Sequence, residues 1–138
     1  MKHIWLTLVF AALASAGLSA QGNMESRIRS MRVAFITERM KLSPEEAEKF
    51  WPIHNQYESE MKKIREKYRA ERDFQTMSDQ EVERFLTDHL DMEEELLKLK
   101  RDYYTRMRKV VPARKLAMYV RADLDFNRKL IQSLQNRK

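Results

Sequence analysis

The fold is decided by residues 43–68, SPEEAEKFWPIHNQYESEMKKIREKY. The stretch opens with a helix-start signal, because Ser43 can cap exposed amides, Pro44 fits the first helical position and Glu46 completes a capping box. Apolar and aromatic residues then recur at steps of four and three, which is a heptad seam. The seam consists of Phe50, His54, Tyr57, Met61, Ile64 and Tyr68. We therefore predict a helix from Pro44 to about Phe74.

Pro52 lies inside this predicted helix. Its ring removes the amide that would bond to Glu48 and crowds the carbonyl of that residue. We therefore expect a kink near Trp51.

Every other segment after Asn23 also shows a helical period, and none alternates as a strand would. A first helix is predicted from about Met24 to Met40, with its apolar stripe on Ile28, Met31, Phe35 and Leu42. A second capping box, residues 78–81, starts a third helix that reaches about Val111. The seam of this helix is Val82, Phe85, His89, Met92, Leu96, Leu99, Tyr103, Met107 and Val110.

Pro112 ends or bends the third helix. A fourth helix follows, with its apolar residues at Leu116, Val120, Leu124, Ile131 and Leu134. The fold class is therefore all-α, with four helices around a long central hairpin.

The second and third helices should each be roughly 45–50 Å long at 1.5 Å per residue. A short turn near Thr76 joins them, so we expect them to pack antiparallel, with His54 opposite about Leu99. The two shorter helices of one chain cannot cover so long a hairpin. We therefore predict a homodimer.

Residues 1–20 have the pattern of a secretory signal peptide, with an uncharged apolar run from Ile4 to Ala16 behind a short basic start. Cleavage after Ala16 or after Ala20 is compatible with the small residues there, and an uncleaved membrane anchor is the alternative. Residues 21–138 then form one helical domain, which we expect in the periplasm. The chain has 0 cysteines, so helix packing or association must stabilise it without disulfides.

No catalytic set is visible in the sequence. There is no cysteine nucleophile and no glycine-rich phosphate loop, so we expect a protein that is not an enzyme and binds no cofactor. A metal site is the sharper alternative, but His54 and His89 should lie on the order of 15 Å apart along the hairpin. Ligands must lie about 2.0–2.1 Å from a shared ion, so we expect both histidines in the packed seams and no metal ligand.

The charge is unevenly distributed. Residues 71–95 hold 2 Lys/Arg and 10 Asp/Glu, net −8, whereas residues 96–138 hold 13 and 3, net +10. In an exported protein this basic excess does not indicate nucleic acid, so we expect none as a partner. The cations that gather around Pro112 are either a solvated face or a patch that attracts acidic or unfolded proteins.

The run from Leu42 to Ile53, LSPEEAEKFWPI, resembles the Leu-Thr-x-x-Gln segment of the exported Spy/CpxP chaperones and the ZraP- and CnrX-like metal sensors. It is most similar to the Bacteroidetes sensors of extracytoplasmic sigma factors. Residues 110–115, VVPARK, look like a degenerate second copy. The resemblance implies a hooked antiparallel hairpin and a cradle-shaped dimer. It also implies ATP-independent holding of unfolded exported proteins, or sensing of envelope stress.

Two departures from the pattern matter. Ser43 replaces Thr and Glu46 replaces Gln, which a capping box tolerates, and the His-rich ends of the metal-sensor branch are missing. The expected partners are unfolded or exported client proteins, or a membrane-bound anti-sigma regulator; a heavy-metal-responsive regulator is the alternative. The residues expected on the binding face are Arg32, Phe35, Arg39, Arg108 and Arg114. The family-motif residues that we expect to have a structural role are Leu42, Ser43, Pro44, Glu46, Phe50, Trp51, Pro52 and Pro112.

Overall fold

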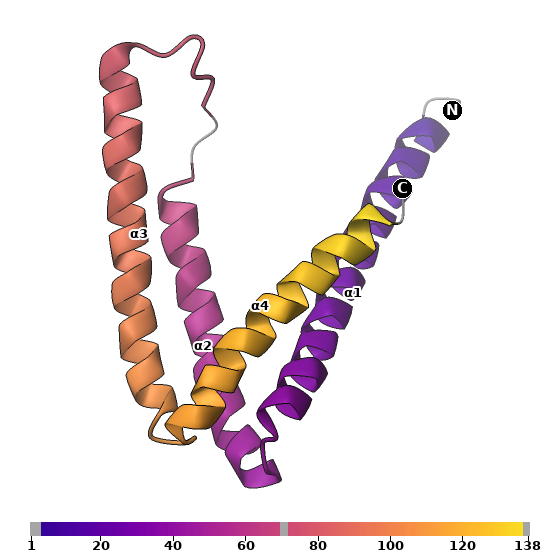
Figure 1. Ribbon diagram of the computed structural model, residues 1–138. Coiled ribbons are helices and arrows are strands. Elements are labelled where there is room, and N and C mark those ends of the chain that lie inside the picture. Colours follow the sequence, from indigo (N-terminus) through magenta and orange to yellow (C-terminus); the bar gives the residue numbers. More distant parts are fainter. Residues whose placement is uncertain (1–3, 70–71, 137–138) are drawn as a thin grey trace. The chain divides into compact units, whose positions relative to one another are not determined.

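The computed structural model of the chain describes residues 4–69 and 72–136, with the side chains of residues 22–69 and 72–136. Within these ranges the protein is all-α, with four helices and no strand, as predicted. The helices are α1 (Ile4–Met40), α2 (Pro44–Lys67), α3 (Asp79–Met107) and α4 (Ala113–Gln135), shown in Figure 1. No helix of this described part is both long enough and apolar enough to cross a bilayer. The side chains of the predicted signal peptide lie outside the described residues, so its cleavage stays a prediction.

The helices form two compact units. Unit 1 comprises Met1–Met40 and Tyr119–Lys138, and therefore contains α1 and most of α4. Unit 2 comprises Lys41–Met118, and therefore contains α2, α3 and the first turns of α4.

Both predicted capping boxes are present in unit 2. The Ser43 hydroxyl accepts from the Glu46 amide at 3.2 Å, and the Glu46 carboxylate accepts from the Ser43 amide at 2.8 Å. Ser78 and Glu81 repeat the arrangement at 3.4 Å and 2.8 Å. These reciprocal bonds satisfy two amides that a helix start otherwise leaves without partners, which explains why α2 and α3 begin where the sequence predicts.

The predicted end of α2 near Phe74 is wrong, because the helix ends at Lys67. The segment that follows folds back onto α3. Arg72 pairs with Asp88 at 3.3 Å, and the Phe74 ring lies 4.9 Å from the Phe85 ring. These contacts favour a longer connection over further turns of helix. The third helix is also shorter than predicted, ending at Met107 and not near Val111.

Within unit 2, α2 and α3 lie side by side and run in opposite directions (Figure 1). The rings of Tyr57 and Tyr103 are 5.3 Å apart, and the Tyr103 hydroxyl donates to Glu60 at 2.8 Å. Nearer the connection, Lys67 donates to Glu95 at 2.5 Å. This register places His54 near Met107 and not near Leu99, so the predicted register is wrong. The helices are not joined by the predicted short turn, because α2 ends at Lys67 and α3 begins at Asp79.

The core of unit 2 lies at the end where α2 starts. The predicted seam is buried there, at Phe50, His54, Tyr57, Tyr103 and Met107, together with Val111 and Leu116. Towards the connection, the seam residues from Met61 onward on α2 are only half-buried. The helix runs through Pro52 without interruption, so the proline costs one hydrogen bond but does not end it.

Unit 1 is built on aromatic contacts between α1 and α4. Its buried side chains are Ile36, Met40, Tyr119, Ala122 and Phe126. The predicted stripes of both helices are wrong in part, since Met31 on α1 is exposed and so is most of the predicted α4 stripe. The larger aromatic residues Tyr119 and Phe126, one heptad apart, form the buried face of α4 instead.

Candidate functional site

A polar cluster holds the segment that precedes α2. Lys41 has a φ of 51°, a left-handed backbone conformation, and its carbonyl accepts from the Lys115 ammonium at 2.8 Å. The same ammonium forms an ion pair with the Glu46 carboxylate, which also accepts from the Ser43 amide. The Lys115 and Glu46 side chains are only 25% and 22% exposed. One cation from α4 therefore fixes both the turn and the cap of α2.

The remaining motif residues of α2 form an aromatic cluster. The Phe50 ring meets the Trp51 ring edge-on at 5.3 Å, and Trp51 meets the ring of buried His54 at 5.0 Å. Pro112 precedes the first residue of α4, and its carbonyl accepts from the Leu116 amide at 3.1 Å. The positions of Phe50, Trp51 and Pro112 fit a structural role. The cap residues Leu42, Ser43, Pro44 and Glu46 fit such a role as well.

The Glu46 contacts have a consequence for pH dependence. The hydrogen bond from Lys115, followed by that from the Ser43 amide, lowers the pKa of the Glu46 carboxyl below its usual 4.5. A carboxylate with a lowered folded-state pKa stabilises the fold above pH 4.5, and this contribution is lost as the pH falls through the lowered value.

We therefore expect Glu46→Gln to remove part of the acid sensitivity of the fold. Urea midpoints measured between pH 7 and pH 3 should fall less steeply for Glu46→Gln than for the wild type. Glu48→Gln, at an exposed position of the same helix, is the control and should follow the wild-type curve. Parallel curves for Glu46→Gln and the wild type would refute the assigned role.

The predicted binding residues of α1 are largely engaged within unit 1. The Arg32 guanidinium donates to Asp123 at 3.0 Å and to Asn127 at 2.9 Å, and lies 5.2 Å from the centre of the Phe126 ring. The Phe35 ring lies 5.8 Å from that of Phe126. Two further cations lie over the Phe35 ring, Arg39 at 5.0 Å and Lys129 at 4.9 Å. The structure brings Arg32, Phe35 and Arg39 together, but in a cluster that fastens α1 to α4.

The other two predicted binding residues are exposed in unit 2. Arg108 follows the last turn of α3 and Arg114 lies in the first turn of α4, with Lys109 between them in sequence. Among the described residues, none of these three cations lies within ion-pair distance of a carboxylate. We call them the basic patch.

Sequence reasoning missed that two rows of large apolar side chains are exposed. The α4 row consists of Val120, Leu124, Ile131 and Leu134, and the α3 row includes Leu86, Leu90 and Leu97. In each row the steps of three, four or seven residues place the side chains on one face of the helix. The hydropathy pattern could identify both helices as amphipathic. It could not separate the buried face from an exposed apolar one.

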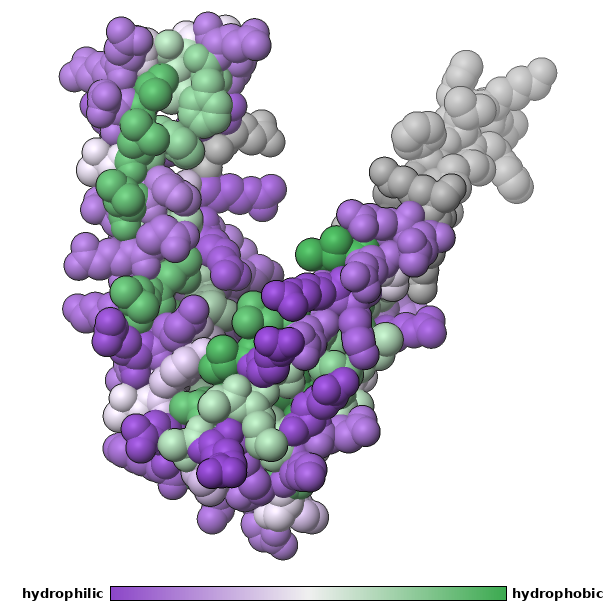
Figure 2. All heavy atoms as spheres, viewed as in Figure 1, coloured by the Kyte–Doolittle hydropathy of each residue, from purple (hydrophilic) through white to green (hydrophobic). Residues whose placement is uncertain are grey.

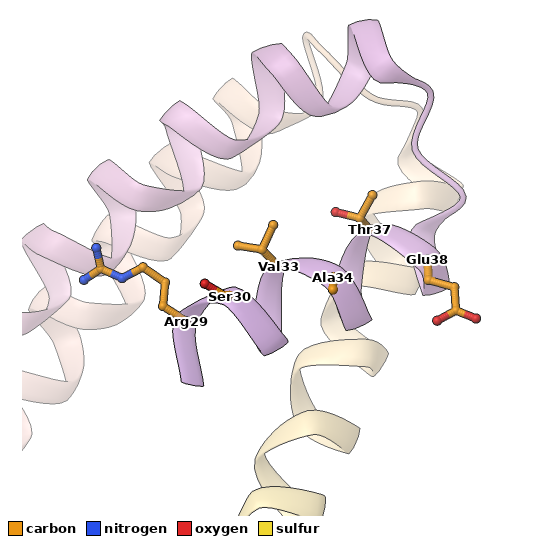
Figure 3. Close-up of a pocket in the computed structure, with 6 residues that line it drawn as sticks. All are labelled: Arg29, Ser30, Val33, Ala34, Thr37 and Glu38. Atoms are coloured by element: carbon orange, nitrogen blue, oxygen red, sulfur yellow. The ribbon is translucent and has the colours of Figure 1, made fainter. Parts of the chain in front are cut away.

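The face of α1 in Figure 3 is a third candidate. Arg29, Ser30, Val33, Ala34, Thr37 and Glu38 line an open hollow of about 600 Å³. The four central side chains are small, and the hollow holds no cluster of groups that could act on a substrate. We assign it no role.

The histidines do not form a site. His54 is buried among aromatic rings, whereas His89 is exposed and stacks on Phe85 at 6.2 Å. The prediction that His89 lies in a packed seam is therefore wrong. Within residues 4–69 and 72–136, no group of three or more His, Cys, Asp or Glu side chains could hold a metal ion. The observed register places the two histidines further apart along the α2–α3 pair than the sequence predicts.

Comparison with known proteins adds no constraint: no protein-family model, curated protein or solved structure matches the chain. The resemblance to the Spy/CpxP group therefore rests on the sequence alone, that is, on the two runs quoted above and on the predicted helix order and hairpin length. The exposed apolar rows and the basic patch remain as the candidate functional surfaces.

Proposed function

We propose that the protein is an exported, ATP-independent binding protein, chaperone-like or a sensor of envelope stress, that holds unfolded or partner proteins without catalysis. The observation that carries this proposal is the α4 row, which presents four large apolar side chains to solvent along one helix. Contiguous exposed apolar surface in a soluble protein usually marks an interaction site. Unfolded chains offer apolar segments that such a row can cover.

Charge supports the same proposal. The basic patch of Arg108, Lys109 and Arg114 provides long-range attraction for acidic segments, which raises the rate of encounter. On α4 itself, Arg121 and Arg128 both pair with Asp125, at 3.4 Å and 3.9 Å, and border the apolar row. Electrostatic capture followed by apolar contact is the mechanism that we propose.

The hairpin arrangement of the helices and the oligomeric state are also part of this proposal. The resemblance implies that α2 and α3 form the hooked hairpin of the Spy type, and that two copies associate in a cradle-shaped homodimer. Near the connection, the seam residues of α2 are only half-buried. This leaves apolar surface for a second copy and supports the homodimer. A membrane-bound anti-sigma regulator is the partner in the sensor form of the proposal.

Aggregation of a denatured acidic client, such as reduced α-lactalbumin, tests the proposed function by light scattering. We expect the wild type in molar excess to suppress the signal. Leu124→Ser/Ile131→Ser should lose at least half of that suppression, because it removes two members of the α4 row. Both residues are 50% or more exposed, so the substitutions should leave the fold intact.

Met24→Ser/Met118→Ser is the matched control, because it removes two exposed apolar side chains outside the row. It should retain wild-type suppression. No suppression by the wild type at any excess would refute the chaperone form. Equal losses in both double variants would refute the assignment to the α4 row.

A further inference from the structure

The outward face of α3 carries a row of apolar side chains whose leucines are largely exposed. Leu86, Leu90 and Leu97 are 49%, 68% and 50% exposed, and half-buried Tyr104 continues the same stripe one heptad after Leu97. At 100° per residue these four positions fall within a narrow sector of the helix. Tyr103, which packs on α2, lies well outside that sector. Figure 2 shows apolar side chains following α3 along this face.

Charges are placed symmetrically in opposite sign about Leu97. Glu93 and Glu94 precede it by four and three residues, and Lys100 and Arg101 follow it by three and four. All four side chains are exposed. Within the described part of the chain, none of the four takes part in an ion pair. When the helix is reversed end to end about Leu97, each acidic position is exchanged with a basic position.

From this pattern we propose that α3 packs antiparallel against α3 of a second copy, with Leu97 of both copies on the two-fold axis. Leu90 then faces Tyr104 of the second copy. Glu93 faces Lys100, and Glu94 faces Arg101, on opposite flanks of the apolar row. The two-fold axis makes each contact twice, as an isologous interface requires. The inference rests on the proposed homodimer and specifies its interface.

Self-complementarity selects a second copy over other occupants. A parallel pair would bring Glu93 against Glu93 and Lys100 against Lys100, and like charges at such flanking positions destabilise helix pairs. An unrelated partner gives no reason for the symmetric sign change about one leucine. With Leu97 on the two-fold axis, residues 87–107 of the two α3 helices overlap, which gives a seam of roughly 30 Å. The α4 row lacks this symmetry and is left for clients.

Charge reversal with complementation tests the interface by sedimentation equilibrium of the full chain. Glu93→Lys/Glu94→Lys and Lys100→Glu/Arg101→Glu should each raise the dimer dissociation constant at least about tenfold, because all four flanking pairs become repulsive. An equimolar mixture of the two variants should recover a dimer, since every pair across the interface is then opposite in sign. Lys62→Glu/Lys63→Glu, on exposed α2 positions, makes the same change of net charge as Lys100→Glu/Arg101→Glu and should not alter the dimer.

Cysteine substitution tests the register independently, because the chain has 0 cysteines. Under oxidation, Leu97→Cys should form a disulfide-linked dimer by itself. Leu90→Cys should crosslink when mixed with Tyr104→Cys, and much less when alone. A crosslinked Leu90→Cys homodimer without a Leu97→Cys dimer would overturn the antiparallel register.

The outcomes separate the interface from the dimer and from client binding. A monomeric wild type overturns both the homodimer and its interface. A dimeric wild type that the charge reversals leave unchanged overturns the interface alone. Circular dichroism of each variant shows whether a loss of dimer reflects unfolding, and the single-cysteine crosslinks decide the matter if a reversal variant does not fold. Suppression of client aggregation by the α4 row is measured separately, so either proposal can fail without the other.

Discussion

Phe50→Ala is expected to lower the free energy of unfolding by about 3–5 kcal/mol. The Phe50 side chain is 0% exposed, among the largest of the fully buried side chains, and it lies edge-on to Trp51. Truncation removes its burial and leaves a cavity next to the capping cluster at the start of α2. Because small domains are stable by only about 5–15 kcal/mol, this loss is a large share of the total. Urea denaturation followed by circular dichroism measures it.

Phe74→Ala is the control for Phe50→Ala. Phe74 is 53% exposed and touches Phe85 at the edge of unit 2, so we expect a cost below about 1 kcal/mol. Comparable losses in the two variants would show that the start of α2 is not the core of unit 2.

The start of α2 could be predicted from sequence because its signal is local. Ser43 and Glu46 satisfy two amides at the helix start, Pro44 has no amide that needs a partner, and the structure contains both bonds of the predicted capping box. The end of α2 has no such signal. Residues 65–72 contain good helix formers and no glycine or proline, so propensity favours continuing the helix. Contacts of Arg72 and Phe74 with α3 outweigh that preference.

The register of α2 on α3 could not be predicted for the same reason. A seam with a regular heptad spacing is compatible with several registers, and the length of the connection selects among them. Tyr103 reaches Glu60 with its hydroxyl, and Lys67 reaches Glu95 with its ammonium. These polar pairs lie at the rim of the seam and are invisible to a hydropathy pattern.

The sequence predicts accessible positions for only some of the expected binding residues. Arg108 and Arg114 are exposed. Arg32 and Phe35 on α1 were expected on a binding face, but they pack against α4. A sequence shows that an arginine lies beside an aromatic stripe. It does not show whether a carboxylate 91 residues later, here Asp123, will reach it.

Arg32→Ala is expected to destabilise unit 1 by about 2 kcal/mol, because charge-assisted hydrogen bonds to charged groups contribute about 1.5–3 kcal/mol. The Arg32 and Asp123 side chains are only 21% and 25% exposed, so solvent screens the pair weakly. The substitution leaves Asp123 and Asn127 without the guanidinium that both accept from. Chemical denaturation gives the loss, and amide hydrogen exchange along α4 locates it.

Two comparisons decide whether Arg32 holds helices together or binds clients. Arg39→Ala removes an exposed cation that lies over Phe35, so we expect a loss of only about 0.5–1 kcal/mol. Arg32→Ala/Asp123→Ala should cost less than the sum of its single variants, since the two side chains are direct partners. If Arg32→Ala instead keeps full stability and abolishes suppression of client aggregation, the sequence-based assignment of Arg32 to the binding face is right, and its role in fastening α1 to α4 is wrong.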